Sequence, residues 1–288
     1  MDYSEYSSPG TEIREYMAEV SDGVTLRIID FTPTREEKDT PLILFVAGWI
    51  SLISGWKGVM KSITPRFRTL YLETREKKSS VVPVKKKVSY TIKRLTEDLK
   101  NVIDRTIPEG RDFVLAGSSL GATAILEYLA LHHRDPLCAI LIAPNPEFRF
   151  PKILGDLILA LTPPSLYHLI KPLIKWYLRN FRLDKKREQE QIKKYETTLD
   201  EADPYKLKAN AKALKTYKIW DILEGITAPC LFIGATSDTL HGTTNIKRLM
   251  NLIPRSVYRE LASNKETHSE KAGELMIDFI SGKEYDRI

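Results

Sequence analysis

A serine flanked by glycines, in the segment Gly117-Ser118-Ser119-Leu120-Gly121, carries the strongest chemical signal in the chain. An apolar run, Phe113 to Ala116, precedes it, and a segment rich in Ala, Leu and Ile follows it. A Gly-x-Ser-x-Gly between a strand and a helix places the serine hydroxyl on a strained turn at the carboxyl end of a sheet, where small neighbours permit the bend. The pattern predicts Ser119 as a nucleophile, with Gly117 and Gly121 as the glycines of the turn.

Two alternatives apply to the same segment. Ser118 is the neighbouring hydroxyl and the second candidate nucleophile. In a purely structural interpretation, the glycines only permit close packing of a strand on a helix, and Ser119 caps that helix. The middle position in the motif favours Ser119 as the nucleophile.

A serine hydroxyl needs a base to accept its proton, and histidine is the side chain suited to that role. The chain contains five histidines. His268 follows a loop, Ala262 to Thr267, between the last strand-like and the last helix-like segment, so we expect it to be the base. His241 is the reserve candidate.

The base in turn needs an acidic partner that fixes its tautomer. Asp238 follows the strand-like run Leu231 to Ala235 at a carboxyl strand end, and we expect it to fill this role, although aspartate is also common in ordinary turns. Glu147, which follows the preceding strand-like run, is the alternative acid.

The elements that must position these residues alternate between strand and helix. A hairpin is predicted first, at Glu12 to Val20 and Val24 to Phe31, because side chains alternate on both sides of Ser21-Asp22-Gly23. Further strands are predicted at Leu42–Ala47, Thr69–Glu73, Phe113–Ala116, Ala139–Ala143, Leu231–Ala235 and Ser256–Leu261, and helices at Tyr90–Arg105, Leu120–His133, Asn245–Leu252 and Lys271–Ile280. This order predicts an α/β protein with a mainly parallel central sheet and flanking helices.

The alternation stops between about Phe148 and Tyr217, where only helical patterns occur, at Ile153–Leu161, Tyr167–Phe181 and Lys185–Tyr195. An all-helical insertion between two strands is typical of a lid over one end of the sheet. We therefore predict a core domain of residues 1–147 and 218–288, with residues 148–217 as a helical cap. Its apolar side chains are expected mostly to pack, and in part to line an acyl pocket.

These motifs together resemble the α/β-hydrolase family, in its esterase, lipase and thioesterase branch, over most of Glu12 to Ile280. Phe45-Val46-Ala47-Gly48-Trp49 is similar to the family's His-Gly-x oxyanion turn, and Glu73-Thr74-Arg75 stands where the family often has Asp-x-Arg-Gly. The resemblance implies that the backbone N–H groups of Trp49 and Leu120 form the oxyanion hole. Two departures are Ala47 in place of the common histidine, and a lysine-rich loop without glycine after Arg75.

Composition narrows the remaining possibilities. The net charge is +6, and basic residues cluster at Arg75–Arg94, with eight against one acidic residue, and at Lys171–Glu196. Such clusters predict at most a weak interaction with an anionic lipid surface, and no nucleic-acid motif accompanies them. The two cysteines, Cys138 and Cys230, lack metal-site spacing and are expected to be buried thiols, with a disulfide as the alternative. No signal peptide or membrane span is predicted, so we expect a cytoplasmic protein.

The expected activity is hydrolysis of a carboxylic ester with a medium-length or lipid-like acyl group, through an acyl-enzyme on Ser119 and without a metal or an organic cofactor. A thioesterase or acyltransferase would use the same residues. A non-catalytic binding protein could keep the same fold. The oligomeric state and the natural substrate have no signal in the sequence.

Overall fold

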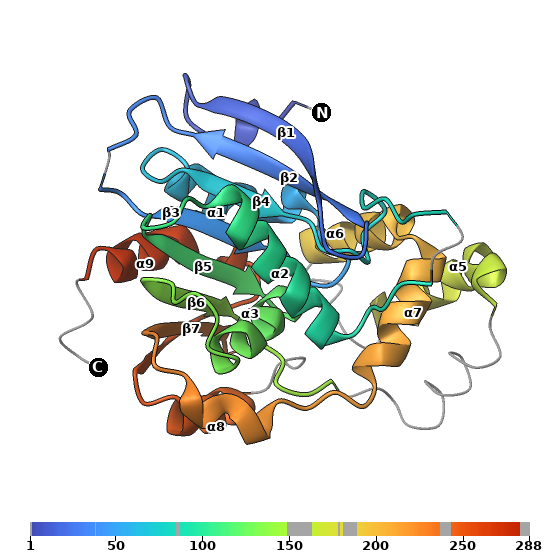
Figure 1. Cartoon of the computed structure of the whole chain (residues 1–288). Helices are drawn as coiled ribbons and strands as arrows, with labels where there is room; N and C mark the ends of the chain where they lie inside the picture. Colours follow the sequence, from blue (N-terminus) through green and yellow to red (C-terminus); the bar gives the residue numbers. More distant parts are fainter. Residues whose placement is uncertain are drawn as a thin grey trace.

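The computed structural model describes residues 2–37, 39–84, 87–148, 163–177, 179–180, 189–236 and 243–282. In these ranges the chain forms an eight-stranded sheet with the order β1-β2-β4-β3-β5-β6-β7-β8 (Figure 1). The strands are β1 (Glu12–Glu19), β2 (Thr25–Thr32), β3 (Leu42–Val46), β4 (Thr69–Leu72), β5 (Phe113–Ser118), β6 (Cys138–Ile142), β7 (Cys230–Ala235) and β8 (Ser256–Leu261).

The sheet begins with an antiparallel hairpin and continues as a parallel sheet. β1 pairs with β2, and β2 with β4, in antiparallel register, whereas every pair from β4 to β8 is parallel. The hairpin turns at Gly23, whose φ of 79° is accessible to glycine at little cost. Because β3, β5 and β6 are neighbours in the parallel part, the loops that follow them meet at one edge of the sheet.

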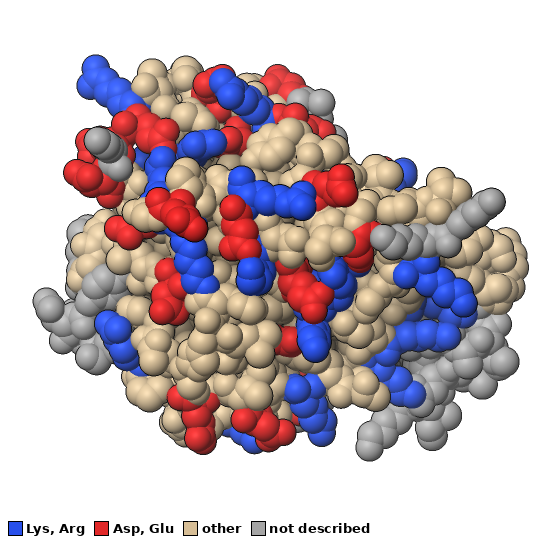
Figure 2. Space-filling view, in the orientation of Figure 1, with Lys and Arg blue, Asp and Glu red and all other residues tan. Residues whose placement is uncertain are grey.

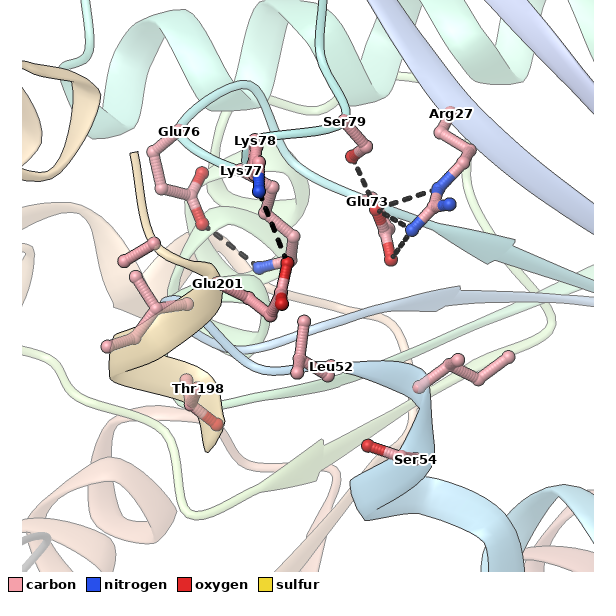
Figure 3. A pocket seen from close by; sticks show the side chains of 13 residues that line it. Arg27, Leu52, Ser54, Glu73, Glu76, Lys77, Lys78, Ser79, Thr198 and Glu201 are labelled. Carbon is pink, nitrogen blue, oxygen red and sulfur yellow. Dashed lines mark hydrogen bonds and ion pairs between the residues drawn. The ribbon is translucent and has the colours of Figure 1, made fainter. Parts of the chain in front are cut away.

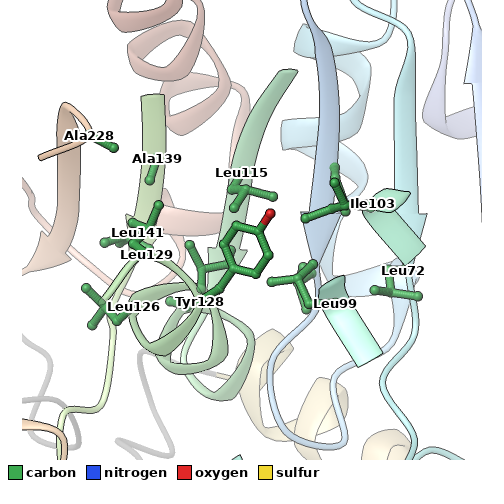
Figure 4. Packing of buried hydrophobic residues seen from close by; sticks show 14 of the residues in the cluster. Leu72, Leu99, Ile103, Leu115, Leu126, Tyr128, Leu129, Ala139, Leu141 and Ala228 are labelled. Carbon is green, nitrogen blue, oxygen red and sulfur yellow. The ribbon is translucent and has the colours of Figure 1, made fainter. Parts of the chain in front are cut away.

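Helices cover both faces of the sheet. α1 (Lys57–Ile63) and α9 (Glu270–Ile280) pack on one face, and α2 (Ile92–Thr106), α3 (Leu120–Ala130) and α8 (Thr243–Leu252) on the other. Alternate residues of each central strand serve the two layers, and Figure 4 shows the layer in which Leu99 and Ile103 of α2 lie near Leu115 of β5 and Tyr128 of α3. Burial of each such side chain contributes about 1.5–3 kcal/mol to stability.

In the described part of the segment between β6 and β7, three α-helices lie beyond the carboxyl ends of the parallel strands (Figure 1): α5 (Tyr167–Tyr177), α6 (Gln189–Glu201) and α7 (Pro204–Leu214). Asp203 caps α7, accepting hydrogen bonds from the backbone N–H groups of Tyr205 and Lys206, and Pro204 occupies the first helical position. α5 packs on α6 through the Tyr167 hydroxyl, which donates to Leu199 O at 2.7 Å.

The mainly parallel sheet with flanking helices and the N-terminal hairpin confirm the fold class expected from the sequence. Observed boundaries differ by a few residues, as for α3, which ends at Ala130 rather than at His133. The short helices α1 and α7 were not predicted. The helix predicted at Ile153–Leu161 lies outside the described residues, and the helix predicted at Lys185–Tyr195 is described from Gln189 and extends to Glu201.

Four basic residues of the cluster at Arg75–Arg94, namely Arg75, Lys77, Lys78 and Arg94, form ion pairs with carboxylates. The Arg75 side chain is fully buried and donates to Asp98 Oδ1 at 2.6 Å and to Asp22 Oδ2 at 2.8 Å, and Arg94 also reaches Asp98. Burial disfavours the charged form of Arg75, but the hydrogen bonds that its guanidinium donates to these carboxylates outweigh the effect of burial and raise its pKa. In Figure 2 basic and acidic side chains are interspersed over much of the face shown.

Cys138 and Cys230 lie on the adjacent strands β6 and β7 as buried thiols, and no disulfide joins them. Burial raises the pKa of the Cys230 thiol, so at neutral pH it stays protonated. No helix in the described ranges has the length and apolar character needed to cross a bilayer.

Candidate active site

Ser119 lies on a strained turn between β5 and α3. Its φ of 47° and ψ of −113° lie outside the regions that residues with a side chain normally adopt, and its backbone N–H is held by Ile142 O of β6 at 2.9 Å. Its side chain makes no capping hydrogen bond to α3, although it occupies the N-cap position. The capping alternative is therefore wrong for this serine.

The glycines on each side are required by close packing. A Cβ at Gly121 would lie 2.2 Å from Val46 O, and one at Gly117 would lie 2.7 Å from Ile125 Cδ1. α3 thus begins directly against the end of β3. This contact places the loop after β3 beside Ser119.

Two other strand ends at the same edge are strained. Ile50, in the loop after β3, has a φ of 47°, and Ala143, after β6, has a φ of 46°. Each such conformation costs on the order of 1–3 kcal/mol and persists only where the surroundings enforce it. Strain of this kind clusters at functional sites, which makes this edge the candidate site on backbone evidence alone.

Asn145 is a member of the site that sequence reasoning missed. Its Nδ2 donates to Ser119 Oγ at 3.2 Å, and its backbone is held by the Thr123 hydroxyl, which also donates to Ser119 O. The available signal was its position three residues after β6, where the carboxyl end of a neighbouring strand faces the serine.

His268 ends a short 3₁₀ helix, Glu266–His268, between β8 and α9. Its Nδ1 lies 2.8 Å from the backbone O of Asn264 and 3.1 Å from the Thr267 hydroxyl. Because a carbonyl oxygen can only accept, Nδ1 carries the proton in this arrangement. Nε2 is then the nitrogen with a lone pair, as a general base requires.

The indole of Trp56 lies against the imidazole of His268, with ring centroids 4.1 Å apart and ring planes at 34°. Trp56 is fully buried and its Nε1 donates to Ser51 Oγ at 2.9 Å. The start of α1 also packs tightly on the start of α9, since a Cβ at Gly58 would lie 2.9 Å from Ser269 Cα. The loop after β3 therefore contacts both the proposed nucleophile and the proposed base.

The two expected oxyanion donors, Trp49 and Leu120, belong to the loop after β3 and to the start of α3, which contact each other. Gly48 abuts the serine turn, because a Cβ there would lie 3.4 Å from Ser119 Cβ, and Trp49 follows it directly. Leu120 is the first residue of α3, where a backbone N–H has no acceptor within the helix. Leu120 therefore follows Ser119 in the chain, and Trp49 follows the residue that contacts Ser119.

The candidate acids are less completely placed. Asp238 and the reserve base His241 lie outside the described residues. Glu147 accepts a hydrogen bond from Trp220 Nε1 at 3.3 Å, and its backbone pairs with Lys218 ahead of β7. Among the described residues, no group of three His, Cys, Asp or Glu is arranged to hold a metal ion.

A cavity of about 290 Å³ lies beside the loop after β3 (Figure 3). Its walls come from the loops after β3 and β4, the side chain of Arg27 on β2, and the end of α6, which contributes Thr198 and Glu201. Glu73 is held there by Arg27, which donates to it from Nη2 at 2.8 Å and from Nε at 2.9 Å. The cavity thus lies between the sheet and the helical segment that connects β6 to β7.

Comparison with known proteins gives a fold and no sequence family. No family model and no curated protein sequence matches the chain. The structure is similar to an enol-lactonase from Burkholderia xenovorans LB400 (TM-score 0.76, 21% identity, 92% of this chain and 100% of that chain). It is also similar to a hydrolase from Pseudomonas aeruginosa PA01 (0.75, 19%, 93% and 98%) and an esterase from Exiguobacterium antarcticum (0.74, 16%, 93% and 100%). The chain therefore has the α/β-hydrolase fold.

Proposed function

We propose that the protein is a serine hydrolase of carboxylic esters, with Ser119 as nucleophile and His268 as general base. The observation that carries the proposal is the strained Ser119 backbone at a strand end, beside a loop that contacts both residues. Structural neighbours that are described as esterases share this fold. Because these neighbours are only 16–17% identical to this chain, the similarity supports the fold alone. The argument for activity rests on the site residues of this chain.

In the proposed reaction His268 Nε2 takes the proton of Ser119 Oγ as the oxygen attacks the ester carbonyl. The N–H groups of Trp49 and Leu120 bind the resulting oxyanion, and collapse expels the alcohol, which takes the proton from His268. Water, activated by the same imidazole, then hydrolyses the acyl-enzyme. Asp238 is the proposed partner of Nδ1 on the imidazolium, beside the Asn264 carbonyl, with Glu147 as the alternative.

The substrate we propose is an ester with a medium-length or lipid-like acyl group. The cavity of about 290 Å³ is at the small end of the range for small-molecule sites, and Ile50, Leu52 and Ile53 give it an apolar wall. Charged and polar side chains line most of the rest of it, and Ser119 and His268 are not among its lining residues. We further propose that residues 148–217 act as a cap over this edge of the sheet. In support, α6 lines the cavity and Lys206 of α7 binds the loop after β4.

A weak interaction with an anionic lipid surface also forms part of the proposal. Leu166, Leu169, Leu173 and Trp176 recur at intervals of three and four residues, so they share one face of the segment that includes α5, and each is 41–76% exposed. Co-sedimentation with anionic vesicles should fall when Leu169 and Leu173 are both replaced by Ser. Equal sedimentation of wild type and this variant would contradict a role for α5.

Turnover of nitrophenyl esters of increasing acyl length tests the activity directly. Wild type should show a chain-length optimum, and Ser119→Ala and His268→Ala should each lose at least about a thousandfold in kcat. Matched thioesters separate an esterase from a thioesterase that uses the same residues. Folded wild type that turns over no ester and no thioester would instead favour a binding protein.

A further inference from the structure

Lys77 is a buried lysine whose side chain reaches the loop after β3. It is 5% exposed, and its Nζ donates to the backbone O of Gly48 at 2.7 Å and to Glu76 Oε1 at 3.1 Å. The adjacent Lys78 has a side chain that is 67% exposed and reaches Glu201 at 3.4 Å (Figure 3). Lysine is almost never buried unless it is paired, so the position of Lys77 needs an explanation that Lys78 does not.

The acceptor of Lys77 belongs to the same peptide unit as a proposed oxyanion donor. The O of Gly48 and the N–H of Trp49 lie on one rigid plane, and the described chain contains no cis peptide bond. In a trans unit these two groups point in opposite directions. A group that fixes the Gly48 carbonyl therefore also fixes the direction of the Trp49 N–H.

We propose that Lys77 is a positioning residue that aims the Trp49 N–H at the oxyanion formed on Ser119. The inference rests on the proposed ester hydrolysis and deepens it. Gly48 lies against Ser119, so the peptide unit that Lys77 fixes borders the site of the proposed reaction. Ser51 N donates to the same Gly48 oxygen at 3.1 Å and closes a turn through the strained Ile50.

The loop that carries Lys77 is itself fixed from two directions. Lys206 of α7 donates from Nζ to Lys77 O at 2.9 Å and to Ser80 O at 2.6 Å. From the core side, the Thr74 hydroxyl donates to the same Glu76 oxygen that Lys77 contacts, at 2.7 Å. Lys77 can therefore hold the peptide with little reorganisation when charge develops on the substrate, which is the condition under which such donors lower a barrier.

A positive group on the carbonyl also strengthens the donor at the other end of the peptide. Hydrogen bonds polarise one another, so a cation at Gly48 O makes the Trp49 N–H a better donor to an anion. This chain lacks the histidine common before the oxyanion glycine and has a lysine-rich loop after Arg75. In this proposal, Lys77 gives the lysine-rich loop after Arg75 a function.

Lys77→Met tests the proposal, because methionine keeps the unbranched stem and removes the donor. Lys87→Met is the control, since Lys87 is an exposed lysine of the same loop and does not line the cavity. Two readouts are compared with wild type: ester kinetics, and the affinity for a trifluoromethyl ketone, which forms a tetrahedral oxyanion adduct with a serine. In Lys77→Met we expect kcat to fall about tenfold to hundredfold with KM nearly unchanged, and ketone affinity to fall by a similar factor. Lys87→Met should keep both the wild-type kinetics and the wild-type ketone affinity.

A merely structural role for Lys77 would lower the melting temperature without this selective loss, so thermal unfolding of both variants is measured alongside. Lys77→Gln, which keeps a donor, should recover part of kcat. If wild type loses activity on Ser119→Ala but folded Lys77→Met matches Lys87→Met in kcat and ketone affinity, the inference about Lys77 fails and the proposed function stands. If Ser119→Ala retains wild-type activity, the proposed function fails, and the inference fails with it.

Discussion

Trp56 and His268 are far apart in the sequence, but their rings are in contact, with centroids 4.1 Å apart and planes tilted by 34°. The indole also donates to Ser51 in the loop that contains Trp49. One buried side chain thus connects the proposed base to the proposed oxyanion loop. Removing it should disturb both.

Trp56→Phe should lower kcat about tenfold, because the smaller ring loses both the donor to Ser51 and part of the surface that orients the imidazole. Phe45→Leu is the matched control, since Phe45 packs on Trp56 within the same layer, with ring centroids 4.9 Å apart. Both changes should cost about 1–2 kcal/mol in the free energy of unfolding. Ester kinetics and urea unfolding on the two variants check this, and an equal effect on kcat would reject a specific role for Trp56.

Asn145→Ala should slow acylation about tenfold, because the amide that holds Ser119 Oγ at 3.2 Å is lost. Asn145→Asp should be slower still, since a carboxylate beside the serine opposes the negative charge that develops there. Stopped-flow measurement of the acylation phase distinguishes the two. If both variants acylate at the wild-type rate, Asn145 has no part in the reaction.

Gly121→Ala should destabilise the protein by more than about 3 kcal/mol, because the new methyl group would meet a backbone oxygen that cannot move aside. Gly110→Ala is the comparison: its φ is 77°, but nothing lies within 4 Å of the new Cβ, so the cost should be about 1 kcal/mol. Chemical denaturation gives both values. The reverse order would contradict the packing of α3 on β3.

Glu127→Gln should change the pH dependence of stability. Burial raises the pKa of Glu127 despite the hydrogen bond from the Tyr217 hydroxyl at 2.7 Å. The folded state therefore holds this proton to higher pH than the unfolded state does, and wild type loses stability as pH rises from the ordinary glutamate pKa through the raised one. Glutamine keeps the acceptor without the charge.

Unfolding of Glu127→Gln and wild type should accordingly be compared from pH 4 to pH 8. We expect the stability of the variant relative to wild type to increase across the window that begins at the ordinary glutamate pKa and to be constant above the raised pKa. A difference that stays flat, or that decreases with rising pH, would show that the burial of Glu127 carries no ionisation penalty.

Much of the fold could be predicted because its signals are local. Apolar runs such as Leu42–Val46 identify buried strands, and Gly-x-Ser-x-Gly identifies the turn through the close approach that Gly121 permits. The short helix α1 was missed because seven residues with a glycine give little periodicity. The packing of α1 on α9 brings Trp56 to His268, and this tertiary contact leaves no local pattern in the sequence.

For the candidate site, the sequence suggests a nucleophile and a base but does not suggest the residues that contact them. Ser119 and His268 follow from chemistry and position in the chain. Asn145, Trp56 and Lys77 are placed by contacts between segments that are far apart in sequence, and no spacing rule links Lys77 to Gly48. The basic cluster that includes the loop after Arg75 was expected at most to contact an anionic lipid surface, yet the first lysine of this loop, Lys77, is buried.

Stoichiometric labelling with a fluorophosphonate, followed by mass spectrometry of the labelled peptide, tests the central claim most directly. The modification should fall on Ser119, should be lost in Ser119→Ala, and should persist in Ser118→Ala, in which the neighbouring hydroxyl is removed. A folded protein that takes up no label, or one that is labelled at another residue and keeps its label in Ser119→Ala, would contradict the assignment of Ser119 as the nucleophile.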